Sequence, residues 1–182
     1  MVRLAHAVIL PVAAAASIAS AGPITVGAGL GVTQDQVNSS QDPNTTLSAF
    51  GRIALTHHFG AELDLTKVDT GSGYSARVIT GLAVLDLGDS VRWVPQVFAG
   101  LGYDQANVGY GDVEGHHFEG GLGLEYRAAG GFTVGARFHL GSRSIDSQPA
   151  VYPLACCSDL WSPNTLEAGE YRSLGAYAGI RF

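Results

Sequence analysis

Three features of the amino-acid sequence predict an all-β fold, an eight-stranded antiparallel up-and-down β-barrel that spans a membrane. Apolar residues recur at every second position from Ile24 onward, which is the period of a β-strand. One of the two faces defined in this way carries no charged residue. The connections between the segments alternate between short and long. The composition, 46% hydrophobic and 14% charged, excludes a disordered acidic chain and a solvated helical bundle.

The first 21 residues have the layout of a cleaved secretory signal peptide. Arg3 gives a positive start, residues 7–18 form an apolar stretch, and Ala19-Ser20-Ala21 is an A-x-A cleavage site. Cleavage after Ala21 would leave residues 22–182, which we expect to form one barrel domain. Beyond this leader no apolar run reaches the length of a membrane helix, so a membrane would have to be crossed by strands.

Eight segments carry the alternation and are the expected strands. They cover residues 24–32, 47–55, 61–65, 76–84, 91–101, 118–126, 132–140 and 174–182. The short connections are 57–60, 86–90 and 128–131, and the long ones are 33–46, 66–75, 102–117 and 141–170. Antiparallel strands would place all short turns at one rim, as in transmembrane barrels with periplasmic turns and longer outer loops.

The two faces of these strands differ in charge. We expect the apolar face to contact lipid; it carries Ile53, Leu55, Leu63, Leu65, Val78, Leu82, Trp93, Val97, Phe118, Leu122, Leu124, Tyr126, Phe132, Val134, Phe138, Leu140, Ile180 and Phe182. The other face carries Arg52, Glu62, Asp64, Arg77, Arg92, Glu119, Glu125, Arg137 and Arg181, with Arg127 as a further candidate. A soluble barrel would place its apolar face inward and its charges outward.

The charged face predicts a closed lumen. An isolated buried charge costs several kcal/mol, so the inward Arg and carboxylate side chains should pair into a network that plugs the barrel. The glycines of the same parity would leave room for long Arg and Glu side chains; they are Gly27, Gly29, Gly31, Gly100, Gly121, Gly123, Gly135, Gly175 and Gly179.

The last strand has apolar residues at every second position from Leu174 and ends on Phe182. It resembles the C-terminal strand of bacterial outer-membrane proteins, which their assembly machinery recognises and which usually ends in Phe. Residues 22–182 as a whole resemble the small eight-stranded outer-membrane barrels of the OmpA/OmpX type. The resemblance implies an outer-membrane location, contact with outer-membrane lipids and lipopolysaccharide, and recognition of the Phe182 strand by the barrel assembly machinery. This scaffold hosts adhesins, structural anchors and lipid-modifying enzymes, so the resemblance assigns no activity.

The candidate ligand-binding motifs favour structural interpretations. The glycines of Gly27–Val32 resemble a dinucleotide fingerprint, but the third comes one place early and a strand continues where a helix is required. His57-His58 and His116-His117 lie at opposite rims, and adjacent strand residues point to opposite faces, which favours rim histidines over metal ligands. We therefore expect no metal and no cofactor.

The nucleophiles and paired carboxylates predict no catalytic site. Glu119 and Glu125 share a face but stand roughly 20 Å apart along a strand, and pairing with Arg92 or Arg137 is the simpler account. A lipid A deacylase would carry a Ser/His pair on its lipid-facing wall, whereas His139 and Ser142 differ in parity. Four states remain possible for the adjacent residues Cys156-Cys157: a strained disulfide, free thiols, intermolecular links and an attached lipid.

Acidic residues gather in or beside the long connections, where only Lys67, Arg143 and Arg172 oppose them. They are Asp35, Asp42, Asp69, Asp104, Asp112, Glu114, Asp146, Asp159, Glu167 and Glu170. Solubility of an exposed rim is favoured over divalent-cation bridging to lipopolysaccharide phosphates or an adhesive surface. The net charge of −6, without a basic stripe, excludes nucleic acid as a partner.

The sequence therefore predicts a structural or surface-interaction protein of the outer membrane without chemistry of its own. The alternatives are an outer-leaflet lipid-modifying enzyme, a narrow channel and a secreted lipocalin-like binder.

Overall fold

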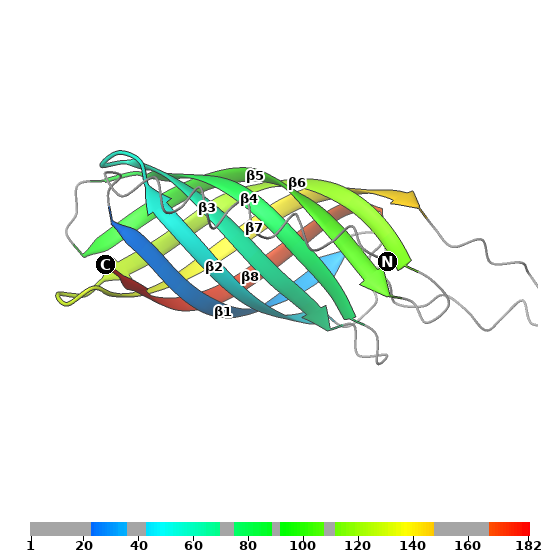
Figure 1. The fold of residues 1–182 in the computed structure, drawn as a ribbon, viewed down its shortest axis with the longest axis horizontal. Helices are drawn as coiled ribbons and strands as arrows, with labels where there is room; N and C mark the ends of the chain where they lie inside the picture. The colour runs from blue at the N-terminus through cyan, green and yellow to red at the C-terminus, as the bar shows by residue number, and fades with distance from the viewer. Residues whose placement is uncertain (1–22, 36–42, 70–74, 89–91, 108–111, 148–167) are drawn as a thin grey trace, which may run out of the picture.

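Eight antiparallel strands close into a barrel in sequence order, and β8 returns to pair with β1 (Figure 1). The computed structural model describes residues 23–35, 43–69, 75–88, 92–107, 112–147 and 168–182. The strands are β1 (Ile24–Asp35), β2 (Asn44–Ala54), β3 (Phe59–Asp69), β4 (Ser75–Asp86), β5 (Trp93–Asn107), β6 (Asp112–Arg127), β7 (Phe132–Ser147) and β8 (Gly169–Arg181). The predicted fold class and all eight strands are confirmed. The predicted signal peptide lies outside the described residues.

The strands run further than predicted, mainly toward the end that we call the long-connection end. β5, β6 and β7 have 15, 16 and 16 residues. As a result, connections 70–74 and 108–111 at this end are about as short as 55–58, 87–92 and 128–131 at the opposite, short-turn end. The strict alternation of lengths is therefore wrong. In the extended part of β6, Val113, Gly115 and His117 still point inward and alternate with outward residues, so the β5–β6 ladder continues. The outward residues there are polar, so the alternation of apolar residues that predicted the strand is no longer visible.

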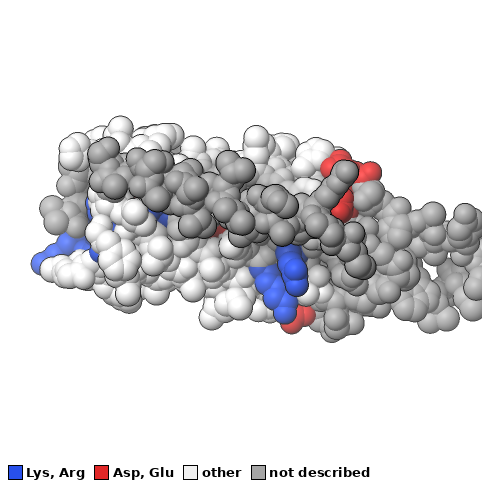
Figure 2. Space-filling view, in the orientation of Figure 1, with Lys and Arg blue, Asp and Glu red and all other residues white. Residues whose placement is uncertain are grey.

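The barrel wall is apolar outside and polar inside, the reverse of a soluble protein. Large hydrophobic side chains face outward on every strand, with Leu30 65%, Leu101 72% and Leu122 62% exposed. The buried set includes charged residues from five strands, namely Arg52, Glu62, Asp104, Glu125, Arg137 and Arg143. In Figure 2 the described surface over the middle of the barrel is largely uncharged, and charged residues gather toward the two ends.

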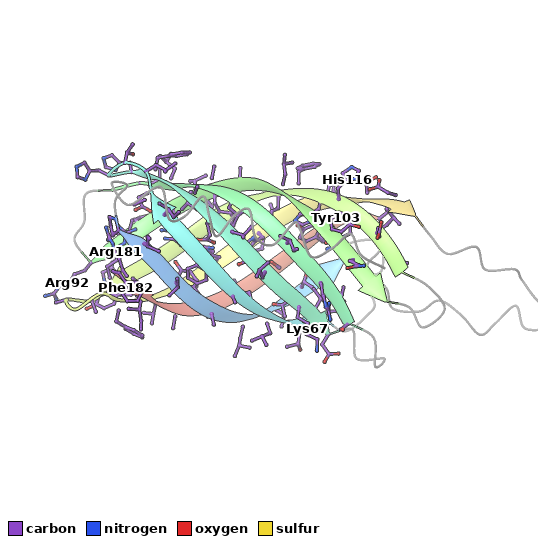
Figure 3. All side chains as sticks on the ribbon, viewed as in Figure 1. Lys67, Arg92, Tyr103, His116, Arg181 and Phe182 are labelled. Atoms are coloured by element: carbon purple, nitrogen blue, oxygen red, sulfur yellow. The ribbon has the colours of Figure 1, made fainter. Side chains whose placement is uncertain are left out.

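Aromatic residues mark the short-turn end of the outer surface. Phe59, Trp93 and Phe132 are exposed there, and the rings of Trp93 and Tyr126 lie 4.9 Å apart between centroids. Figure 3 places Arg92, Arg181 and Phe182 at this end, and Lys67, Tyr103 and His116 toward the other. Girdles of aromatic residues flank the apolar band of transmembrane barrels at the interfaces.

Strand β4 faces the other way from the prediction. Val78 and Leu82 point into the barrel, whereas Arg77 and Ile79 are on the outside. Both parities of β4 are apolar, so alternation alone does not orient it, and the ladder with β3, in which Arg77 pairs with outward Lys67, fixes the face. Arg92 is also outside the lumen, because it lies exposed before β5 begins.

Backbone hydrogen bonds join the end of β8 to both of its neighbours at the short-turn end. The Phe182 amide donates to the Ile24 carbonyl over 2.8 Å, and the Arg181 amide donates to the Gly131 carbonyl over 2.7 Å. These bonds extend the β1–β8 and β7–β8 ladders to the rim. In the described part of the chain, no helix has the length and hydropathy needed to cross a membrane.

Candidate functional site in the barrel lumen

Glu62 of β3 is the centre of one buried cluster, nearer the short-turn end. Arg52 of β2 donates from Nε to Oε2 of Glu62 over 2.7 Å. Arg137 of β7 donates from Nη2 to the same oxygen over 2.9 Å and from Nη1 to Oε1. The Glu62 side chain has no exposed surface, and those of Arg52 and Arg137 are 7% and 5% exposed. One carboxylate thus joins two guanidinium groups that come from different parts of the barrel wall.

Glu125 of β6 extends this cluster toward the short-turn end. It accepts from Nη1 of Arg52 over 2.8 Å, from the Tyr177 hydroxyl over 2.8 Å and from Nε of Arg127 over 2.7 Å. Arg127 continues the chain by donating from Nη2 to Asp86 over 2.5 Å. The cluster therefore spans the lumen from β2 to β6 and includes β4.

Aromatic rings pack against the Arg137 guanidinium. Its carbon lies 4.7 Å from the centroid of the Tyr177 ring, 5.4 Å from that of Phe98 and 5.6 Å from that of Phe50. The inward glycines provide the space for these rings: a Cβ added at Gly135 would collide with Tyr177. The predicted reason for the glycines therefore changes, because at several positions they accommodate aromatic rings rather than Arg and Glu side chains.

A second cluster lies nearer the long-connection end. Nδ1 of His117 donates to Oδ2 of Asp104 over 2.8 Å, and Nε2 lies 3.1 Å from the Thr80 hydroxyl. Arg143 approaches the same Asp104 oxygen with Nε at 3.3 Å and donates from Nη1 to Asp35 over 3.2 Å. The His117 and Asp104 side chains are 0% and 2% exposed.

Glu119 pairs with His139 and Tyr171, neither of which was expected as its partner. It accepts from Nδ1 of His139 over 3.1 Å and from the Tyr171 hydroxyl over 2.7 Å. The expected partners Arg92 and Arg137 are wrong for Glu119 and Glu125, because Arg92 is outside the lumen and Arg137 binds Glu62. Sequence parity placed both carboxylates inside but did not give the strand tilt and register that decide which side chains meet across the lumen.

A small cavity of about 100 Å³ adjoins both clusters. Its lining includes Asp64, Thr80, Glu119, Arg137 and His139. Thr80, His117 and Asp104 stand in the hydroxyl–imidazole–carboxylate order of a nucleophilic triad. Ligand pockets typically have volumes of roughly 300–1,000 Å³, so this cavity suits a few water molecules. The geometry therefore favours a structural role for the three residues.

The four candidate histidines do not form one site. His57 and His58 are exposed in the connection 55–58, whereas His116 points outward and pairs with Asp146 over 2.9 Å. His117 is buried in the lumen, so its interpretation as a rim histidine is wrong. Over the described residues, no group of three or more His, Cys, Asp or Glu side chains could hold a metal ion.

Some residues assigned to the acidic outer rim belong to the lumen instead. Asp104 and Arg143 are buried, and Asp35 accepts from Arg143. The outer surface keeps the exposed residues Asp146 and Glu170. Among the predicted residues, Asp42, Cys156, Cys157, Asp159 and Glu167 lie outside the described part of the chain. Gly27, Gly29 and Gly31 face inward in a continuing strand, which excludes a dinucleotide-binding turn there.

No protein-family model and no curated protein sequence matches this chain. Solved structures do resemble it. The N-terminal β-barrel domain of Pseudomonas aeruginosa OprF matches with a TM-score of 0.57 and 17% identity, covering 87% of this chain and 97% of that one. Neisserial surface protein A matches with a TM-score of 0.59 and 12% identity, covering 88% and 96%.

Ail, the attachment invasion locus protein of Yersinia pestis, matches with a TM-score of 0.50 and 12% identity, covering 88% of this chain and 97% of its own. The neighbours are thus small outer-membrane barrels matched over nearly their whole length. The chain has the fold of an eight-stranded outer-membrane β-barrel, consistent with the OmpA/OmpX type.

Proposed function

We propose that the protein is an integral outer-membrane barrel with a structural or surface-interaction role in the cell envelope and without catalytic activity. The observation that carries this proposal is the reversed wall, with large hydrophobic side chains outside and paired charges inside. In water such a wall would expose an apolar belt around the whole barrel, whereas a bilayer covers it. Neighbours named as a surface protein and as an attachment protein support the same role.

The proposal includes a closed lumen. Ion pairs join β2 to β3 and to β6, and they join β7 to β3 and to β5. The lumen that they cross is just wide enough for side chains in a barrel of eight strands. A barrel plugged in this way conducts no ions. Planar-bilayer recordings with the purified protein test this point: we expect no unit conductance, and discrete reproducible steps would overturn the closed lumen.

Membrane fractionation tests the location. We expect the protein in the outer-membrane fraction of expressing cells, with a faster mobility on SDS gels before boiling than after, because a closed barrel resists detergent until heated. A soluble protein without a mobility shift would overturn the proposal and favour a secreted binder.

The proposed orientation places both chain ends and the short turns in the periplasm and the long-connection end outside. Two exposed positions test it, Asp146 near the long-connection end and His57 in a short turn. In a background with both native cysteines replaced by serine, we expect a membrane-impermeant maleimide to label Asp146→Cys on intact cells and His57→Cys only after the cells are broken. The opposite pattern would reverse the orientation.

A further inference from the structure

We propose that Lys67 and Arg77 form a binding site for the phosphate groups of lipid A in the outer leaflet, an inference that rests on the proposed outer-membrane location and orientation. We call this pair the phosphate site. It lies on the outer surface of β3 and β4, away from the lumen clusters, toward the end of the barrel at which Figure 3 labels Lys67.

The two cations of the phosphate site are direct neighbours. Lys67 and Arg77 are Cα partners in the β3–β4 ladder, and both side chains are exposed on the same face. The Cβ atoms of such partners are about 4.5–5.5 Å apart, and like charges placed directly opposite each other destabilise a sheet. An anion bound between them would turn this repulsion into two attractive contacts. Asp69, two positions further along β3, leaves the group with an excess of positive charge.

The phosphate site stands at the edge of the apolar belt. Two positions toward the barrel middle, Leu65 is 49% exposed and Ile79 is 48% exposed on the same face. Two residues of a strand span roughly 7 Å, so the cations lie about that distance further from the barrel middle than Leu65 and Ile79, whose apolar side chains can contact lipid acyl chains. Lipid phosphates occupy this depth, at the boundary between the hydrocarbon and the aqueous layer. The adjoining apolar surface would not contribute to the binding of a free phosphate ion, which has no acyl chains.

One further donor in the same row suits a phosphate. Gln105 of β5 is the ladder partner of Arg77 on its other side and adds one amide to the ammonium and guanidinium groups. The row continues to Glu114 of β6, the ladder partner of Gln105, so the positive charge of the site is confined to Lys67 and Arg77. Arg binds two phosphate oxygens with its planar fork, and Lys adds a point charge.

The distribution of outward cations is asymmetric. On the described strands, outward-facing Lys and Arg are Lys67, Arg77 and Arg172, all toward the long-connection end. Arg172 is engaged differently, since it donates to Gln34 over 2.9 Å. With the proposed orientation these cations face the leaflet that holds lipid A.

Native mass spectrometry of the detergent-solubilised barrel tests the phosphate site. The probes are lipid A with both phosphates and enzymatically dephosphorylated lipid A with the same acyl chains. We expect wild type to prefer the phosphorylated lipid, and Lys67→Ala/Arg77→Ala to bind it about tenfold or more weakly, because both charge-assisted contacts to the phosphate are lost. Lys67→Arg/Arg77→Lys should restore the preference, because both charges return.

Matched controls make the result specific. Arg172→Ala removes a cation near the same end, and Arg92→Ala removes one at the opposite end; both should retain the preference of wild type. Equal binding by wild type and the double alanine variant would overturn the phosphate site, as would an equal loss in Arg172→Ala. Each variant is first shown to migrate as a heat-modifiable barrel, so a failure of the proposed function, in which wild type forms no such barrel, is recognised separately.

Discussion

Arg52 and Glu125 are 73 positions apart in the chain, yet Nη1 of Arg52 donates to Oε2 of Glu125 over 2.8 Å. Their strands, β2 and β6, stand opposite each other in the barrel. The bond thus bridges the lumen, while Glu62 holds Arg52 from the neighbouring strand. Opposite walls of the barrel are connected through side chains as well as through the backbone ladder.

Replacing the central carboxylate should destabilise the barrel strongly. Glu62→Ala leaves Arg52 and Arg137 as buried cations with fewer partners, and removing one member of a buried ion pair costs about 3–5 kcal/mol. Urea unfolding in lipid vesicles, followed by tryptophan fluorescence, measures the free energy of unfolding. Arg92→Ala, which removes an exposed charge, is the control and should leave it unchanged. A Glu62→Ala barrel as stable as wild type would show that the cluster does not support the fold.

Adding a ring-facing methyl group in the lumen should also destabilise the barrel. In Gly135→Ala the new Cβ would collide with the Tyr177 ring, and overpacking of this kind costs about 1–3 kcal/mol. Gly51→Ala is a matched control, because Gly51 faces outward and no atom lies within 4 Å of its added Cβ. The same unfolding assay compares the two. Equal stability of both variants would argue against the close packing of Tyr177.

A charge placed in the apolar belt should destabilise the protein in a bilayer. Leu122→Arg puts a cation on an outward position that is 62% exposed, at an expected cost of about 2–4 kcal/mol if it faces the bilayer midplane. Leu87→Arg adds the same charge in the short connection 87–92 and should cost little. Unfolding from liposomes separates the two variants. Wild-type stability of Leu122→Arg would place that face away from lipid.

Removing the Thr80 hydroxyl should affect stability and leave lipid chemistry unchanged. Thr80→Val keeps the shape but takes away the group that lies 3.1 Å from His117, at an expected cost of about 1–2 kcal/mol. Mass spectrometry of lipid A from cells with and without the wild-type protein should give the same acyl pattern. An altered pattern that disappears in Thr80→Val would instead make the Thr80–His117–Asp104 row catalytic.

The sequence predicted the eight strands and which residues face outward on most of them, because period-two alternation reports directly which side of a sheet a residue occupies. It failed for β4, where both Val78 and Ile79 are apolar, and for Arg77, since charges are tolerated outside the wall near a rim. It also missed the extension of β5 to β7. There outward positions such as Ser144 are polar, so the contrast between the faces is lost although His117 and Arg143 still point inward.

The pairing of the lumen charges was beyond the sequence for a different reason. Whether Arg137 meets Glu62 or Glu119 depends on strand tilt and register, which follow from all eight ladders together. One inward signal was available: Asp104 and Ala106 continue the parity of Phe98, which would have moved Asp104 from the outer rim into the lumen.

The β1–β8 ladder has a consequence for how the molecule forms. Ile24 and Phe182 meet at the seam, so β1, which pairs with β2 on one side, can complete its second ladder only when β8 is present. This closing step joins strands that are far apart in the sequence. Until β8 arrives, β1 and β7 each present an open edge and an uncovered apolar side, the state most prone to aggregation. We therefore expect that the chain must be kept apart from its copies until closure, and that the yield of the barrel depends on when β8 pairs with β1.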